Sequence, residues 1–138
     1  MYGGAAKRYK QVNVQTASRG QILLALYETA IRYSRQGAES IRRGDVVAKG
    51  KELQRVAAIV AELTSTLDHS AAPELCASLE QLYFYMQERL ALANATLDPE
   101  PAEEVAKLLE VLREAWFQAV NQVEGKSTDQ PMAMAVAR

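Results

Sequence analysis

The residue types that carry catalysis and metal binding are scarce in this chain. It contains one histidine, His69, and one cysteine, Cys76. One imidazole and one thiol are too few for a zinc site, and no Glu-x-x-His pair supplies the ligands of a di-iron bundle. A catalytic Ser-His-Asp or Cys-His set would have to use His69, and no glycine-rich phosphate loop is present. The sequence therefore predicts no metal, no cofactor and no enzyme activity.

The other reactive groups have structural interpretations. Cys76 lies near an expected helix start, where the pKa of a thiol can be lowered. We favour the interpretation that Cys76 is a small buried residue of the core. Glu103 and Glu104 fit the first turn of a helix, where carboxylates interact well with the helix dipole.

The composition is typical of one globular domain. The chain has 138 residues, 49% of them hydrophobic and 24% charged, with a formal net charge of −1. A net charge this small gives no electrostatic reason to expect binding to nucleic acid or to an anionic membrane. The N-terminus lacks the apolar core of a signal peptide, and no apolar run approaches the roughly 20 residues that span a bilayer. We expect a cytoplasmic protein that binds no nucleic acid and inserts into no membrane.

Four amphipathic helices are predicted from apolar spacing and capping residues. The first covers about residues 19–43; Ser18 and Gln21 form a possible capping box, and Thr16 is a competing cap. Gly44 ends this helix, and Asp45 caps the second, which reaches residue 67. Pro73 opens the third helix, and the fourth runs from the break at 98–101 to Gly125.

These elements predict an all-α protein, an antiparallel four-helix bundle with short loops. The bundle domain covers residues 18–124. An extended N-terminal segment precedes it at residues 1–17. A short flexible tail follows at 125–138, and its Met-Ala-Met-Ala-Val-Ala stretch either forms a further short helix or stays loose.

Apolar side chains exceed what a simple core needs. On the first helix they spread over about 200°, whereas a core-facing stripe needs only about 100° or somewhat more. The helix therefore contacts two neighbouring helices, or part of its surface serves a partner. On the third helix, Tyr85 and Leu92 lie seven residues apart and off the core stripe, which makes them a candidate groove wall for a partner helix. Trp116 falls on the core stripe of the fourth helix.

Several motifs, in order and with matching gaps, together resemble one family. They are VNVQTAS at 12–18, ILLALY at 22–27, IVAEL at 59–63, LYFYM at 82–86 with RL at 89–90, and EV at 104–105 with AW at 115–116. Over roughly residues 9–120 they resemble the flagellin export chaperones, the FliS family. Arg19 stands where the family pattern has proline, and Glu28-Thr29 where it has Asp-Gly; neither change removes the apolar surface.

The resemblance implies a cytoplasmic helical bundle that binds the disordered C-terminal segment of flagellin. Such a chaperone prevents premature polymerisation and assists delivery to the flagellar type III export apparatus, with an export gate component as a further partner. It also implies that the N-terminal segment can lie over part of the binding surface. The groove residues expected on this basis are Tyr9, Val12, Val14, Ile22, Leu23, Leu26, Tyr27, Tyr85 and Leu92.

Two other hypotheses about the function stay open at this point. One is a helical adaptor that binds another amphipathic client or a regulatory protein. The other, from a different class, is an enzyme or a metal-binding bundle.

Overall fold

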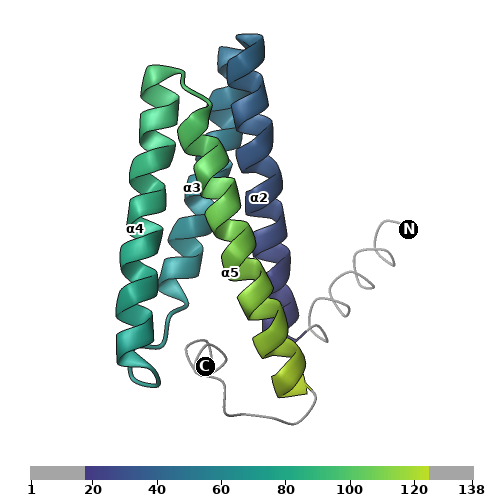
Figure 1. The fold of residues 1–138 in the computed structure, drawn as a ribbon, viewed down its shortest axis with the longest axis vertical. Coiled ribbons are helices and arrows are strands. Elements are labelled where there is room, and N and C mark those ends of the chain that lie inside the picture. Colours follow the sequence, from purple (N-terminus) through teal and green to yellow (C-terminus); the bar gives the residue numbers. More distant parts are fainter. Residues whose placement is uncertain (1–17, 125–138) are drawn as a thin grey trace, which may run out of the picture.

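A computed structural model describes residues 18–124, which form four helices and no strands (Figure 1). The expected N-terminal segment and C-terminal tail lie outside the described residues. The helices are α2 (Arg19–Arg43), α3 (Val46–Ser65), α4 (Pro73–Thr96) and α5 (Glu100–Glu124). They run alternately up and down, which confirms the predicted all-α antiparallel bundle.

The helix ends follow the predicted capping chemistry. The Ser18 side chain accepts a hydrogen bond from the backbone N–H of Gln21 at 3.0 Å. Gly44 ends α2 in the left-handed conformation, at φ 75°, and the side chain of Asp45 then caps α3. Leu97 also adopts a left-handed conformation, at φ 55°, after α4. A non-glycine residue is uncommon in this conformation, and no local sequence pattern predicts it at Leu97.

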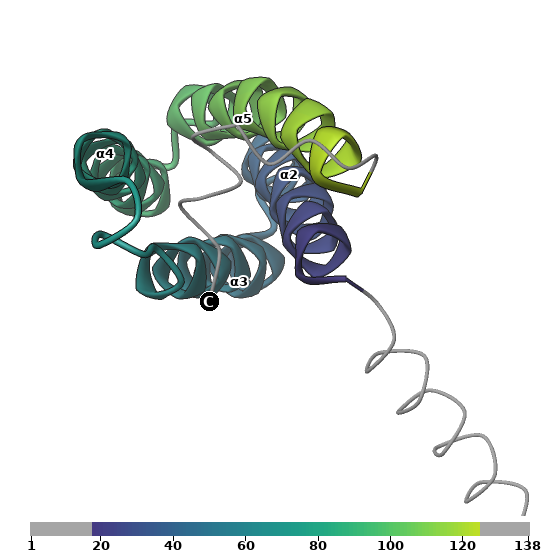
Figure 2. The same ribbon diagram turned by 90° about the horizontal axis from the view of Figure 1, so that it is seen from below.

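The helices are packed unequally around the bundle. α2 packs extensively against α3 and α5, while α4 packs less extensively against the same two helices. α2 and α4 therefore lie on opposite corners of the bundle, and α4 is its most peripheral helix (Figure 2).

Two glycines allow the close approach of α2 to its neighbours. A Cβ atom at Gly37 would lie 2.6 Å from Cδ2 of Leu53 on α3. A Cβ atom at Gly20 would lie 2.7 Å from Cγ1 of Val120 on α5. α2 thus contacts two helices, which accounts for much of its broad apolar surface.

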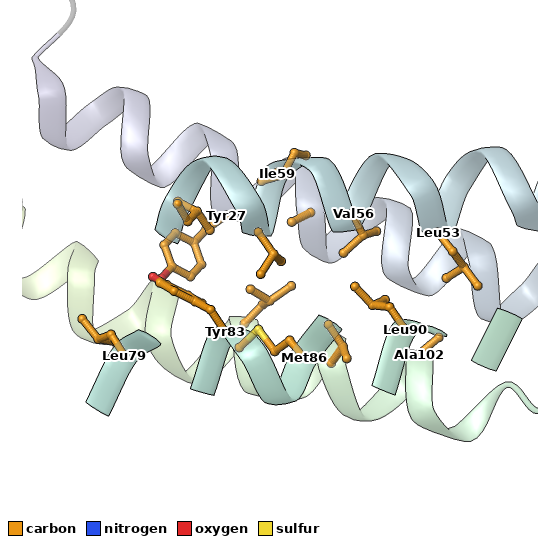
Figure 3. Packing of buried hydrophobic residues seen from close by; sticks show 14 of the residues in the cluster. Tyr27, Leu53, Val56, Ile59, Leu79, Tyr83, Met86, Leu90 and Ala102 are labelled. Carbon is orange, nitrogen blue, oxygen red and sulfur yellow. The ribbon is translucent and has the colours of Figure 1, made fainter. Parts of the chain in front are cut away.

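The core fills the space between all four helices (Figure 3). Trp116 is fully buried in it, as predicted. Val46 is exposed, because it lies on the first turn of α3 at the corner of the bundle. Among residues 18–124, none of the four helices combines the length and the apolar content that a membrane span requires.

Candidate client-binding surface

The expected groove residues on α2 divide between the core and the surface. Ile22 is 42% exposed, and Leu26 is partly buried against the core. Leu23 and Tyr27 are buried, so in this structure both side chains face the core. The physical reason is the central place of α2, which turns one side of the helix towards α3, the other towards α5, and Tyr27 towards α4.

Tyr27 belongs to a buried polar cluster at the centre of the bundle. Its hydroxyl is hydrogen-bonded to the hydroxyl of Tyr83 on α4, and the two side chains point towards each other in Figure 3. The Tyr27 oxygen also accepts a hydrogen bond from Nε1 of Trp116 on α5, at 2.9 Å. Burial raises the pKa of Tyr83 to about 12, and burial, together with Tyr83, raises the pKa of Tyr27 further. The cluster is therefore neutral at ordinary pH, and it joins three helices.

The expected groove residues on α4 are exposed but lie on a different face from those of α2. Tyr85 is 38% exposed and Leu92 is 42% exposed. The Tyr85 hydroxyl donates to Oε2 of Glu104 on α5 at 2.7 Å, which places Tyr85 on the side of α4 that faces α5. Because α2 and α4 lie on opposite corners, Ile22 and Tyr85 do not line one continuous groove. The single groove expected from the sequence is thus divided into separate surfaces.

An open groove on the other side of α4 was not predicted. It lies between the first half of α3 and the second half of α4 and has a volume of about 680 Å³. We call it the α3/α4 groove. Its lining residues are Val46, Val47, Gly50, Lys51, Leu53, Gln54, Ala57, Gln87, Leu90, Ala91 and Asn94.

The rim of the α3/α4 groove carries large exposed apolar side chains. Val47 is 70% exposed on the α3 side. Phe84 is 66% exposed and lies three residues before Gln87 and seven before Ala91, hence on the same side of α4. The signal in the sequence was the spacing of Phe84 with Ala77 and Ala91, two small residues that leave the ring uncovered.

Polar contacts across the α3/α4 groove are few and involve no ion pair among the residues described. The Lys49 ammonium donates to the side-chain and backbone oxygens of Asn94, at 2.6 and 3.2 Å. The Gln87 amide donates to the backbone oxygen of Ala57 at 2.8 Å. The interfaces of α5 with α2 and with α4, by contrast, are crossed by four ion pairs: Arg35–Glu110, Arg42–Glu103, Arg113–Glu28 and Arg89–Glu104.

α4 therefore exposes apolar side chains on both flanks. One flank is the α3/α4 groove with Phe84, and the other carries Tyr85 and Leu92 beside α5. A groove rimmed by apolar side chains and crossed by no ion pair among the described residues suits the apolar face of an amphipathic helix. Tyr9, Val12 and Val14, the other expected groove residues, lie outside the described residues. In the range 18–124, no group of three or more His, Cys, Asp or Glu side chains could hold a metal ion.

Comparison with known proteins agrees with this architecture. The family described as "Flagellar protein FliS" matches residues 1–123. A flagellar secretion chaperone FliS from Bacillus subtilis is 35% identical over 112 residues, covering 81% of this chain and 83% of that protein. The protein of that name from Salmonella typhimurium is 36% identical over 117 residues, covering 81% and 87%. The one from Vibrio cholerae is 29% identical over 119 residues, covering 83% and 88%. The chain therefore belongs to the FliS family of flagellar proteins.

Proposed function

We propose that this protein is a cytoplasmic flagellar secretion chaperone that binds the C-terminal segment of flagellin along α4. The observation that carries the proposal is the match, over most of the chain, to relatives named flagellar secretion chaperones. The two apolar flanks of α4 support it, because they offer uncovered surface to a long amphipathic client. The chaperone family is not a class of enzymes.

The mechanism follows from the surface that α4 presents. A flagellin tail with apolar segments would self-associate, and burial of those segments against α4 shields them and orders them as helices. Ordering the tail costs free energy, so the net affinity is modest for the area buried, which suits a cargo that is later released. Delivery to the export apparatus requires a second contact, with a component of the export gate.

Calorimetric titration tests the proposal. The purified protein is titrated with the C-terminal segment of flagellin from the same organism, and with a segment whose apolar residues are replaced by serine. We expect saturable one-to-one binding of the first segment, with a negative heat-capacity change and a gain in helical circular dichroism. Absence of binding to the folded protein would refute flagellin as the client and favour another helical partner.

A matched pair of variants tests the place of binding. Phe84→Ser removes an exposed ring from the flank of α4, while Phe117→Ser removes an exposed ring from α5. If the client buries Phe84, the first variant should weaken binding about tenfold or more, since burying a Phe side chain contributes about 1.5–3 kcal/mol. The second variant should leave affinity within about twofold. Equal effects of the two substitutions would contradict binding along α4.

A further inference from the structure

The seam between α4 and α5, meaning the line along which the two helices meet, is polar at one end and apolar further along. At the end near the α4–α5 turn, Glu104 accepts hydrogen bonds from Arg89 and Tyr85 and closes the seam. Further along, α5 leaves α4 and crosses towards α2 as it runs to Glu124, in both views of the bundle (Figures 1 and 2). No ion pair joins α4 to α5 in this second part of the seam among the residues described.

Heptad spacing identifies the residues that line this open part. Side chains seven residues apart lie almost on one line along a helix. Starting from Arg89, the equivalent positions on α4 are Leu82 and Leu75, both only partly buried. Starting from Glu104, the equivalent positions on α5 are Val111, which is 68% exposed, and then the exposed Gln118. We call the four apolar residues Leu75, Leu82, Leu108 and Val111 the α4/α5 apolar face.

The chain itself contains a segment that suits this face. Residues 131–137 read PMAMAVA and carry no charged side chain. Met132, Met134 and Val136 alternate with alanine, so an extended conformation places all three on one side. Methionine side chains adapt to irregular apolar surfaces. This segment lies beyond residue 123, where the family match ends.

The length of the connection allows the segment to reach this face. Val111 lies about 20 Å along α5 from Glu124, at a rise of about 1.5 Å per residue. The chain from Glu124 to Met132 spans at most about 29 Å, so Met132 can reach Val111. Val47 lies at the opposite end of the bundle, roughly the 37 Å length of α5 away along its axis, which is beyond the reach of Met132.

We propose that residues 131–137 dock on the α4/α5 apolar face and cover Leu82 and Val111 when no client is bound. The tether holds the segment at a local concentration in the millimolar range, so even a weak contact is well populated. The face adjoins Tyr85, so the docked tail also shields one flank of α4. The contact within the chain does not depend on the proposed function, and its test uses no client.

Disulfide formation in the full chain tests the contact. In a Cys76→Ser background, one protein carries Val111→Cys with Met134→Cys, and the control carries Val47→Cys with Met134→Cys. The two valines are almost equally exposed, at 68% and 70%, so their thiols should be similarly accessible. We expect intramolecular cross-linking to be at least about tenfold faster for the Val111 pair. Equal rates, or a faster Val47 pair, would overturn the proposal.

A second variant separates apolar docking from mere proximity. Met132→Ser and Val136→Ser are added to the Val111 pair, which leaves the tether length unchanged. Docking predicts that the cross-linking rate falls by about fivefold or more, towards that of the Val47 pair. An unchanged rate would show that the tether alone brings the thiols together and would overturn the proposal. Cross-linked dimers as the main product would also overturn it, because they assign the face to a second copy.

Discussion

Replacing Tyr27 with phenylalanine tests whether this residue holds the bundle together or binds the client. The substitution keeps the ring and removes the oxygen that accepts the Trp116 indole N–H and bonds to the Tyr83 hydroxyl. A buried polar group left without a partner costs about 1–3 kcal/mol. Because Tyr27→Phe leaves two such groups, we expect the free energy of unfolding to fall by about 2–6 kcal/mol.

Tyr83→Phe is the matched comparison within the same cluster. It removes only the bond between the two tyrosine hydroxyls and keeps the bond from Trp116 to Tyr27. The expected loss is therefore smaller, about 1–2 kcal/mol. The double variant should cost less than the sum of the single variants, since both share one hydrogen bond.

Urea unfolding followed by far-ultraviolet circular dichroism measures these losses. At an m-value of about 2 kcal/mol per molar urea, Tyr27→Phe should lower the midpoint by roughly 1–3 M, with m unchanged. Client affinity, measured where each variant is folded, should stay within about twofold. The reasoning fails if Tyr27→Phe unfolds like the unsubstituted protein, or if it weakens client binding while stability is unchanged.

Three further outcomes follow from other contacts. Asn94→Ala removes one of two oxygens that accept from the buried Lys49 ammonium, and should lower stability by about 1–3 kcal/mol in thermal unfolding. Trp116→Ala leaves a core cavity and should cost about 3–5 kcal/mol in the same assay. Tyr85→Phe should raise the pKa of Glu104, because the Tyr85 hydroxyl is the main cause of its lowering; a carboxylate titration by NMR measures this shift. Since the lowered pKa stabilises the fold above the ordinary value of 4.5 and this stabilisation is lost as pH falls, the variant should lose less stability on acidification.

Local signals predicted the helices and their ends well. The residues that begin or end the helices contact only their near neighbours in the sequence, so their roles can be recognised without knowledge of the tertiary structure. They are Ser18, Gly44, Asp45 and Pro73. The core stripes were equally accessible, because side chains three and four residues apart share a helix face. Trp116 was placed correctly on this basis.

The candidate site was less predictable because it depends on which helices are neighbours. The first helix has more apolar surface than one contact needs, and this surface could pack against either a partner or a second helix of the bundle. Tyr27 was assigned to a groove on the first interpretation, whereas the packed bundle places it in the core. Ile22 and Tyr85 were grouped without knowing that α2 and α4 lie diagonally. Val47 lines the α3/α4 groove from α3, and Phe84 shares a side of α4 with two of its lining residues; no spacing within one helix reveals such a pair.

The lack of ion pairs across the α3/α4 groove has a consequence for the speed of recognition. Steering by charge can raise association rates to about 10⁸–10⁹ M⁻¹s⁻¹, whereas uncharged surfaces meet at about 10⁵–10⁶ M⁻¹s⁻¹. The net charge is −1, and among residues 18–124 only Lys51 brings an exposed charge to the lining of the groove, so this chaperone belongs to the slower regime. Its encounter rate with a client should then change little with ionic strength. Discrimination between clients would reside mainly in how long each one stays bound.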